Sequence, residues 1–415
     1  MRTSTTTRRV GPHRAGRRAA VAGTGLATLI FGLGGASSAG AQAGGAGAAG
    51  PAFSTPLATS VQAGGGTWAT VAMGNLKQPL NTFWQLMFRP DGSSTWSDRV
   101  EATAVATNGG LVMAAGANAL VVGVRPSNDL TFSPLISTTN AGRSWSNGLL
   151  DQGLASRPRA LALGPGGRAL AVVEGRGGAE VVRGTGNLSS WQPLATTRAL
   201  ASAPAGRACS PSAITSVGFL SSTAVIGSSC QRPGEAGIFM ENGHSWKLSG
   251  PNLASRAGRA EVLGLMPAQG GLATLLGLTA AARGVTGAPA TGPSLVAAWA
   301  GSNGKWRTSA PLGLGNNGRL VSFGATSAAG GGIFALTASP DGRMELAVTS
   351  GPRPVWEHFP APPQTTATVA FLPGGTIDAL AVHNVVLTVW ALSSGSSAWV
   401  KRQVLDVPVQ FGSSS

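Results

Sequence analysis

Short apolar runs bounded by turn-forming residues fill the chain beyond residue 66. Ala119–Arg125, Ile333–Ala338 and Met344–Ser350 are examples, each rich in β-branched or other apolar side chains and flanked by Gly, Pro, Asn or Ser. Between the last two runs, Ser339-Pro340-Asp341-Gly342 predicts a hairpin turn, because proline presets φ and glycine accepts a positive φ. No stretch after Ala41 keeps a helical period between caps. The pattern therefore predicts an all-β protein.

A tryptophan that ends a small polar turn recurs about every 50 residues along the chain. The segments between these tryptophans share a layout, since Ala160–Val173 and Val369–Val382 both place a Pro-Gly-Gly turn between two apolar runs. Each segment is long enough for about four short strands, and four-stranded sheets arranged radially bury both of their faces. We therefore expect a β-propeller over residues 67–412 with seven four-stranded blades, six or eight being the alternatives. The marking residues are Trp96, Trp145, Trp191, Trp246, Trp306, Trp356 and Trp399.

The turn Thr138–Trp145, TTNAGRSW, resembles the Asp-box (BNR repeat) of sialidase-like and sortilin-like β-propellers, whose pattern is Ser-x-Asp-x-Gly-x-Thr-Trp. Two other turns keep part of the pattern, and the remaining four are degenerate or shortened. The resemblance implies that these turns lie on the rim, between the third and fourth strands of a blade and away from the ligand face. The matching positions are Thr138, Asn140, Gly142, Ser144 and Trp145; Glu241, Gly243, Ser245 and Trp246; and Asp91, Thr95 and Trp96.

The residue types of this turn favour a structural role. A short Asp or Asn side chain accepts hydrogen bonds from the amides of its own turn, and glycine provides the left-handed position. A Ser or Thr hydroxyl caps the turn, and the indole buries a large apolar area. We therefore assign no binding or catalytic role to Asn140–Trp145.

Candidate catalytic chemistry is sparse. The chain has no tyrosine, so it lacks the nucleophile of sialidases, and Arg89 in Phe88–Pro90 is not assigned to their arginine triad. Another glycosidase needs two carboxylates about 5–9 Å apart, and the sequence does not pair its unassigned acids. No spacing indicates a metal site, a cofactor loop or a nucleophile elbow. We name no catalytic residue, metal or cofactor. The unassigned acids are Asp129, Asp151, Glu174, Glu261 and Asp378.

The net charge of +15 is concentrated partly at the N-terminus, where six arginines precede the apolar stretch Ala19–Ala36. Ala39-Gly40-Ala41 has the small-x-small form of a signal peptidase site. We expect a signal peptide at residues 1–41, exported by the Sec or twin-arginine route, and no membrane span after cleavage; an uncleaved anchor is the alternative. Residues 42–66 are rich in Gly, Ala and Ser, and this composition predicts a flexible linker.

Cys209 and Cys230 are the two cysteines of the chain. An even cysteine count in an exported protein predicts a disulfide, with free thiols as the alternative. The remaining histidines, His244, His358 and His383, stand at no spacing that would complete a metal site with them.

These features favour an exported, non-catalytic binding or scaffold module, with a secreted glycoside-hydrolase-like propeller as the alternative. Expected partners are an extracellular glycan, an anionic envelope polymer or a protein. Nucleic acid is not expected, because no aromatic residues interleave with the basic ones. If loop-borne arginines converge on one face they attract anions; otherwise they are scattered solvated residues. The arginines in question are Arg157, Arg159, Arg168, Arg176, Arg183, Arg198, Arg207, Arg256 and Arg259.

The final segment Val400–Phe411 is also β-rich. We expect it to close the ring by pairing with the strand predicted at Trp68–Met73.

Overall fold

Antiparallel strands dominate the computed structural model, as the apolar pattern predicts. The structure describes residues 58–407 with gaps at 79–80, 100–109, 117, 125–132, 152–158, 176–177, 186–187, 254–257, 269–270, 280–291, 302–304, 316, 327–330 and 352–353, together with Phe53 and Pro56. The predicted signal peptide and most of the predicted linker lie outside these residues. All the described residues belong to one compact unit, residues 49–415.

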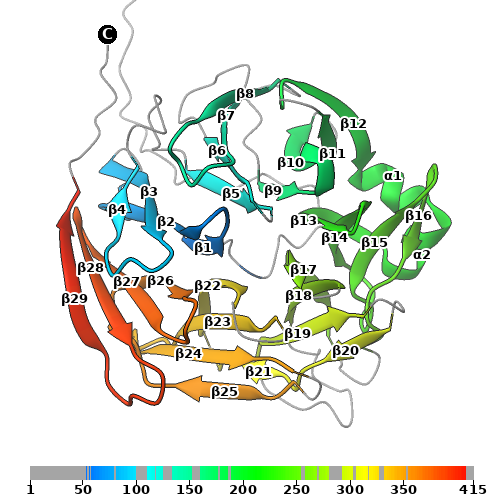
Figure 1. Cartoon of the computed structure of the whole chain (residues 1–415). Helices are drawn as coiled ribbons and strands as arrows, with labels where there is room; N and C mark the ends of the chain where they lie inside the picture. Colours follow the sequence, from blue (N-terminus) through cyan, green and yellow to red (C-terminus); the bar gives the residue numbers. More distant parts are fainter. Residues whose placement is uncertain are drawn as a thin grey trace, which may run out of the picture. The chain divides into compact units, whose positions relative to one another are not determined.

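The described strands follow one another in seven repeats of four, each strand antiparallel to the next (Figure 1). Repeat 1 is β1(Thr59–Gln62), β2(Gly66–Gly74), β3(Thr82–Pro90) and β4(Ser97–Asp98); repeat 2 is β5(Leu111–Ala115), β6(Leu120–Val124), β7(Ser133–Thr138) and β8(Ser146–Leu150). Repeat 3 is β9(Ala160–Leu163), β10(Ala169–Gly175), β11(Gly178–Thr185) and β12(Ser190–Thr196); repeat 4 is β13(Pro211–Leu220), β14(Thr223–Cys230), β15(Gly237–Asn242) and β16(Ser245–Leu248). Repeat 5 is β17(Ala260–Ala268), β18(Gly271–Leu278), β19(Ser294–Ala300) and β20(Trp306–Thr308). Repeat 6 is β22(Arg319–Ala325), β23(Ile333–Ala338), β24(Met344–Thr349) and β25(Trp356–Phe359); repeat 7 is β26(Thr366–Phe371), β27(Ile377–His383), β28(Val386–Leu392) and β29(Val400–Asp406).

A few elements lie outside this plan. The short strand β21(Leu312–Gly313) pairs with β19, and a 3-10 turn, η3(Pro165–Gly167), joins β9 to β10. Two short helices, α1(Thr197–Ser202) and α2(Pro204–Cys209), connect repeat 3 to repeat 4. Repeats 4 and 5 share one sheet through a single residue pair, Ser229 with Glu261. Among the described residues, no helix is long and apolar enough to cross a membrane.

Each repeat packs face to face on the next. In the described residues the apolar core forms seven clusters, and each cluster draws its side chains from two successive repeats. The first strands also contact one another in chain order, from β1 to β5 and onward to β26, and β26 contacts β1 again. This closed succession of four-stranded sheets is the packing of a β-propeller.

Glycines allow these repeats to approach closely. A Cβ at Gly164 of repeat 3 would lie 2.8 Å from the ring of Phe219 in repeat 4. At Gly264 of repeat 5 it would lie 2.5 Å from the ring of Phe323 in repeat 6. A large side chain of one first strand therefore sits over a glycine of the preceding repeat.

The strand order also separates the connections into two faces. Because successive strands alternate in direction, the connections between second and third strands lie at the same edge as those between one repeat and the next. We call this edge the front face. The connections between first and second strands, and between third and fourth strands, lie on the opposite edge, the back face.

The last repeat meets the first through side-chain and backbone hydrogen bonds. The Ser60 hydroxyl of β1 donates to the Val369 carbonyl of β26 at 2.6 Å, and the Gly74 amide donates to the Asn384 carbonyl at 2.8 Å. The expected pairing of the final segment with Trp68–Met73 is wrong, because β29 pairs with β28 while β2 is already paired on both sides, with β1 and β3.

The fold also begins earlier than the predicted linker boundary. Thr59–Gln62 forms β1, and Phe53, which is 8% exposed, packs among side chains of repeats 5 and 6. Its ring would touch a Cβ placed on Gly277, near the front end of β18. The apolar Phe53 is therefore part of the folded core, although the composition around it predicted only a flexible linker.

Candidate functional site

The seven marking tryptophans occupy equivalent places. Each stands within one residue of the start of the fourth strand of its repeat, so the polar turns that they end lie on the back face. Four of the indoles donate to a carbonyl at the end of the preceding repeat's fourth strand: Trp191 to Leu149, Trp306 to Ser249, Trp356 to Ala310 and Trp399 to Pro360. These four tryptophans therefore join neighbouring repeats.

The turn at Asn140 is held by its own side chains. The Asn140 Oδ1 accepts from the Ser144 amide at 3.0 Å, and the Thr138 hydroxyl accepts from the Gly142 amide at 2.9 Å. Gly142 has a φ of +76°, and Trp145 packs edge-on against Trp68 of repeat 1, with 5.6 Å between ring centroids. The side chains of Thr138, Asn140 and Ser144 are thus engaged in holding the turn.

The other two turns are built differently. In the turn before Trp96, the Ser93 hydroxyl accepts from the Thr95 amide at 3.1 Å, and Asp91 is exposed at its edge. Glu241 belongs to β15, where its carboxylate pairs with Arg183 of repeat 3 at 2.5 Å. Gly243 provides the positive φ of that turn, +61°, and the Ser245 hydroxyl donates to the Asn242 carbonyl. The acids matched by the resemblance thus lie outside the hydrogen-bond networks of their turns.

Asp378 is the buried carboxylate of the interface between repeats 7 and 1, with 3% exposure. Its Oδ2 accepts from the Trp96 indole at 2.9 Å and lies 3.6 Å from the Arg89 Nε. Burial raises the pKa of Asp378, while the Trp96 hydrogen bond and the charges of Arg89 and Arg402 act in the opposite direction. This carboxylate is held inside an interface, away from the front-face connections.

The other candidate acids lie in four different repeats of the described part of the chain. Glu174 pairs with Arg159 at 2.7 Å, and Asp341 accepts from the Ser339 hydroxyl in its turn, which lowers the pKa of Asp341. Glu261 is buried at the start of β17, and Asp151 is exposed after β8. Asp129 lies outside the described residues. Within those residues, no group of three or more His, Cys, Asp and Glu side chains is placed to hold a metal ion.

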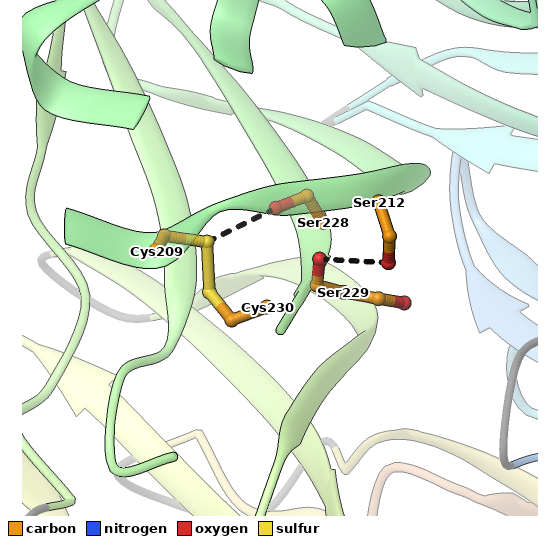
Figure 2. The surroundings of a disulfide bond; sticks show 5 residues. All are labelled: Cys209, Ser212, Ser228, Ser229 and Cys230. Atoms are coloured by element: carbon orange, nitrogen blue, oxygen red, sulfur yellow. Dashed lines mark hydrogen bonds between the residues drawn. A yellow bond between two sulfur atoms is a disulfide. The ribbon is translucent and has the colours of Figure 1, made fainter. Parts of the chain in front are cut away.

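The predicted disulfide between Cys209 and Cys230 is confirmed, with an S–S distance of 2.02 Å and 4.9 Å between the Cα atoms. Figure 2 shows it beside Ser228, whose hydroxyl lies 3.8 Å from the Cys209 sulfur. Both cysteines are buried. Since Cys209 ends α2 and Cys230 ends β14, the bond ties two neighbouring front-face connections together.

Four arginines lie on the front-face connections around this disulfide, and we call them the arginine rim: Arg198 of α1, Arg207 of α2, Arg232 after β14, and Arg259 before β17. All four are exposed, and none of them takes part in an ion pair in the part of the chain that the structure describes. Glu235 is the one acid described within the same connections. The rim is therefore a locally positive surface.

Backbone contacts hold the rim in place. The Arg232 amide donates to the Cys209 carbonyl at 3.2 Å, next to α2. The Gly234 amide donates to the Gly258 carbonyl at 3.2 Å, and the Arg259 amide donates to the Thr279 hydroxyl at 3.0 Å. Helix α1 is capped by the Thr196 hydroxyl and anchored by the fully buried Leu200. Three successive connections are thus linked to one another.

The rim includes some predicted arginines and excludes others. Arg198, Arg207 and Arg259 belong to it. Arg159 and Arg183 are paired with glutamates, and Arg168 lies on the back face, where it donates to the Ser222 carbonyl. Arg157, Arg176 and Arg256 lie outside the described residues. Sequence reasoning missed Arg232, although its position two residues after Cys230 could have indicated it.

No family model matches the chain, and no curated protein matches it. Among solved structures it is similar to YCF48 bound to a D1 peptide, with 14% identity over 80% of this chain and 91% of that one and a TM-score of 0.44. It is also similar to the SapL1 lectin in complex with α-methyl fucoside, with 13% identity, 86% and 98% coverage and a TM-score of 0.44. The six-bladed β-propeller lectin of Aleuria aurantia gives 14% identity, 86% and 96% coverage and a TM-score of 0.40. The fold assignment rests on the strand order and packing described above.

Proposed function

We propose that the chain is an exported, non-catalytic β-propeller of seven blades with Asp-box-like turns, and that it binds an anionic ligand outside the cell or in the cell envelope through the arginine rim. The observation that carries this proposal is the placement of Arg207, Arg232 and Arg259. These three exposed cations lie on successive front-face connections that a disulfide and backbone hydrogen bonds hold together.

Guanidinium groups suit this role. An arginine presents a planar fork of donors that matches carboxylate, phosphate and sulfate oxygens, and it stays charged at all physiological pH values. Because the rim is fixed in the free protein, little ordering of the backbone opposes binding. Acidic glycans and anionic envelope polymers are ligands of this chemistry.

Two features of the chain support the proposed export: its N-terminal sequence and its disulfide. The arginine-rich start followed by an apolar stretch and Ala39-Gly40-Ala41 has the form of a signal peptide. A buried disulfide between Cys209 and Cys230 is stable in oxidising compartments outside the cytosol.

The hydrolase alternative is less well supported. It needs two carboxylates facing one substrate, whereas Asp378, Glu174 and Glu241 are each held by an arginine. A binding module needs no such pair.

The proposal is tested with mature protein, residues 42–415, and a panel of soluble acidic polysaccharides at two salt concentrations. The triple variant Arg207→Gln, Arg232→Gln, Arg259→Gln is compared with Arg143→Gln, Arg307→Gln, Lys401→Gln, which removes the same charge from exposed positions elsewhere. We expect wild-type binding that weakens with salt and is lost only in the rim variant. Equal binding by both triple variants would refute a role for the rim.

A further inference from the structure

The front face carries an exposed apolar side chain as well as the arginine rim. Leu76 is 56% exposed at the tip of the connection between β2 and β3, and Lys77 beside it is also exposed. The other large exposed apolar side chains of the described residues lie elsewhere, Val355 on the back face and Val400 and Val404 on the outer strand β29. Among the described residues, Leu76 is therefore the large exposed apolar side chain of the front face.

The turn that presents Leu76 is firmly built. The Lys77 amide donates to the Asn75 Oδ1 at 3.1 Å, and the Thr82 hydroxyl donates to the Asn75 carbonyl at 2.7 Å. At its base, the Gly74 amide donates to the Asn384 carbonyl of repeat 7. These contacts fix the backbone on both sides of Leu76, so its exposure is a property of the folded turn.

The N-terminal part of the chain reaches the fold at the same face. β1 starts at the front, as the first strand of its repeat, and Phe53 is anchored next to Gly277 near the front end of β18. Only residues 42–52 separate Phe53 from the predicted cleavage site, a length of at most about 40 Å when fully extended. On the export proposed above, a leader still attached at Ala41 would keep Phe53 within that distance of the membrane.

From these three observations we propose that the anionic partner of the arginine rim is a phospholipid bilayer surface. The rim attracts the headgroups of anionic lipids, and Leu76 enters the boundary between headgroups and acyl chains. This inference rests on the anion-binding function proposed above and names its partner. The protein binds at the surface and does not span the bilayer.

Flotation with vesicles of phosphatidylglycerol and phosphatidylcholine, against vesicles of phosphatidylcholine alone, tests the inference on mature protein. We expect binding to the anionic vesicles only, decreasing as salt is raised. The rim triple variant should bind about 100-fold more weakly, since each basic residue near such a surface contributes about a fivefold factor. Leu76→Ser should bind about tenfold more weakly, whereas Val355→Ser, which removes an apolar group from the back face, should bind like wild type.

The outcomes separate the two proposals. Binding to soluble acidic polysaccharides that needs the rim, without binding to anionic vesicles, would overturn the bilayer inference and leave the proposed function standing. Vesicle binding that is unchanged in both the rim variant and Leu76→Ser would also overturn it. Failure of wild-type protein to bind either polysaccharides or vesicles would overturn both. Far-UV circular dichroism and thermal unfolding of each variant show that a lost interaction is not lost folding.

Discussion

The indole of Trp96 donates a hydrogen bond to the carboxylate of Asp378 at 2.9 Å, although 282 residues separate them in the chain. Trp96 occupies the same place in repeat 1 as the tryptophans that donate to a backbone carbonyl of the preceding repeat. Its preceding repeat is the last one, where a buried side chain of β27 supplies the acceptor. At this interface the tryptophan therefore donates to a carboxylate in place of a backbone carbonyl.

Asp378 should make stability depend on pH. Burial raises its pKa in the folded protein, so between the ordinary aspartate pKa of about 4 and the raised value the folded state binds more protons than the unfolded state. The contribution of Asp378 to the free energy of unfolding therefore falls as the pH rises through this window. Asp378→Asn, which removes the titration, should lessen that fall, as measured by urea unfolding at several pH values.

The matched control is Asp406→Asn, which changes an exposed residue of β29. The control should retain the wild-type decrease. If Asp378→Asn follows the same curve as wild type over the whole range, the Asp378 carboxylate does not titrate in the way that its burial requires.

Gln403 should matter more than its exposed neighbours on β29. Its Oε1 accepts from the Trp96 amide at 2.8 Å, and its Nε2 donates to the Trp96 carbonyl at 2.9 Å, so one side chain satisfies both backbone groups of the first repeat's tryptophan. Gln403→Ala should lower the free energy of unfolding by about 1–3 kcal/mol, because it leaves both groups without this partner. Lys401→Ala on the same strand should stay within about 0.5 kcal/mol of wild type. Equal effects of the two substitutions in chemical denaturation would argue against the clamp.

The glycines between first strands should be intolerant of a methyl group. Gly264→Ala places a Cβ 2.5 Å from the Phe323 ring and should destabilise the protein by about 1–3 kcal/mol. Gly313→Ala is the control, because a Cβ there meets nothing within 4 Å. The double variant Gly264→Ala, Phe323→Leu should recover part of the loss if the clash with the ring is the cause. Thermal unfolding of the four proteins decides this, and no recovery in the double variant would place the cause elsewhere.

Local chemistry explains which features the sequence could predict. The strands, the tryptophan turns and the Cys209–Cys230 bond follow from apolar runs, turn residues and an even cysteine count, all of which are read within a short window. The position of Trp145 next to the start of a fourth strand was implied by the resemblance of its turn to the Asp-box. The four-stranded repeats could be predicted from the sequence because each one is a short, local pattern that recurs.

Contacts between repeats could not be predicted from local sequence patterns. The acceptor role of Asp378 and the two hydrogen bonds of Gln403 depend on the register of repeat 7 against repeat 1, which no local pattern states. The same holds for Arg232, whose connection is brought to α2 by the Cys209–Cys230 bond and by the hydrogen bond from its amide to the Cys209 carbonyl. One overlooked signal was present: a glycine adjoins a large apolar residue in several first strands, as in Gly218-Phe219 and Gly264-Leu265.

The disulfide should stabilise the fold and preserve the rim. It joins residues 21 positions apart, and closing a loop of that size contributes about 3 kcal/mol on the chain-entropy model. The double variant Cys209→Ser, Cys230→Ser should therefore unfold at a lower temperature. It should also bind the rim's anionic ligand more weakly, because α2 and the connection after β14 lose their covalent link while Arg207 and Arg232 remain.

Two comparisons separate the disulfide's effects from the substitutions themselves. A reductant should lower the unfolding temperature of wild type toward that of the double variant and should leave the variant unchanged. Because both cysteines are buried, the native protein should react slowly with the reductant, and reduction should accelerate once unfolding begins. A variant that loses stability yet binds the ligand as wild type does would show that the backbone hydrogen bonds to Cys209 hold the rim without the disulfide. Loss of both would assign the disulfide the positioning role that its place between two front-face connections indicates.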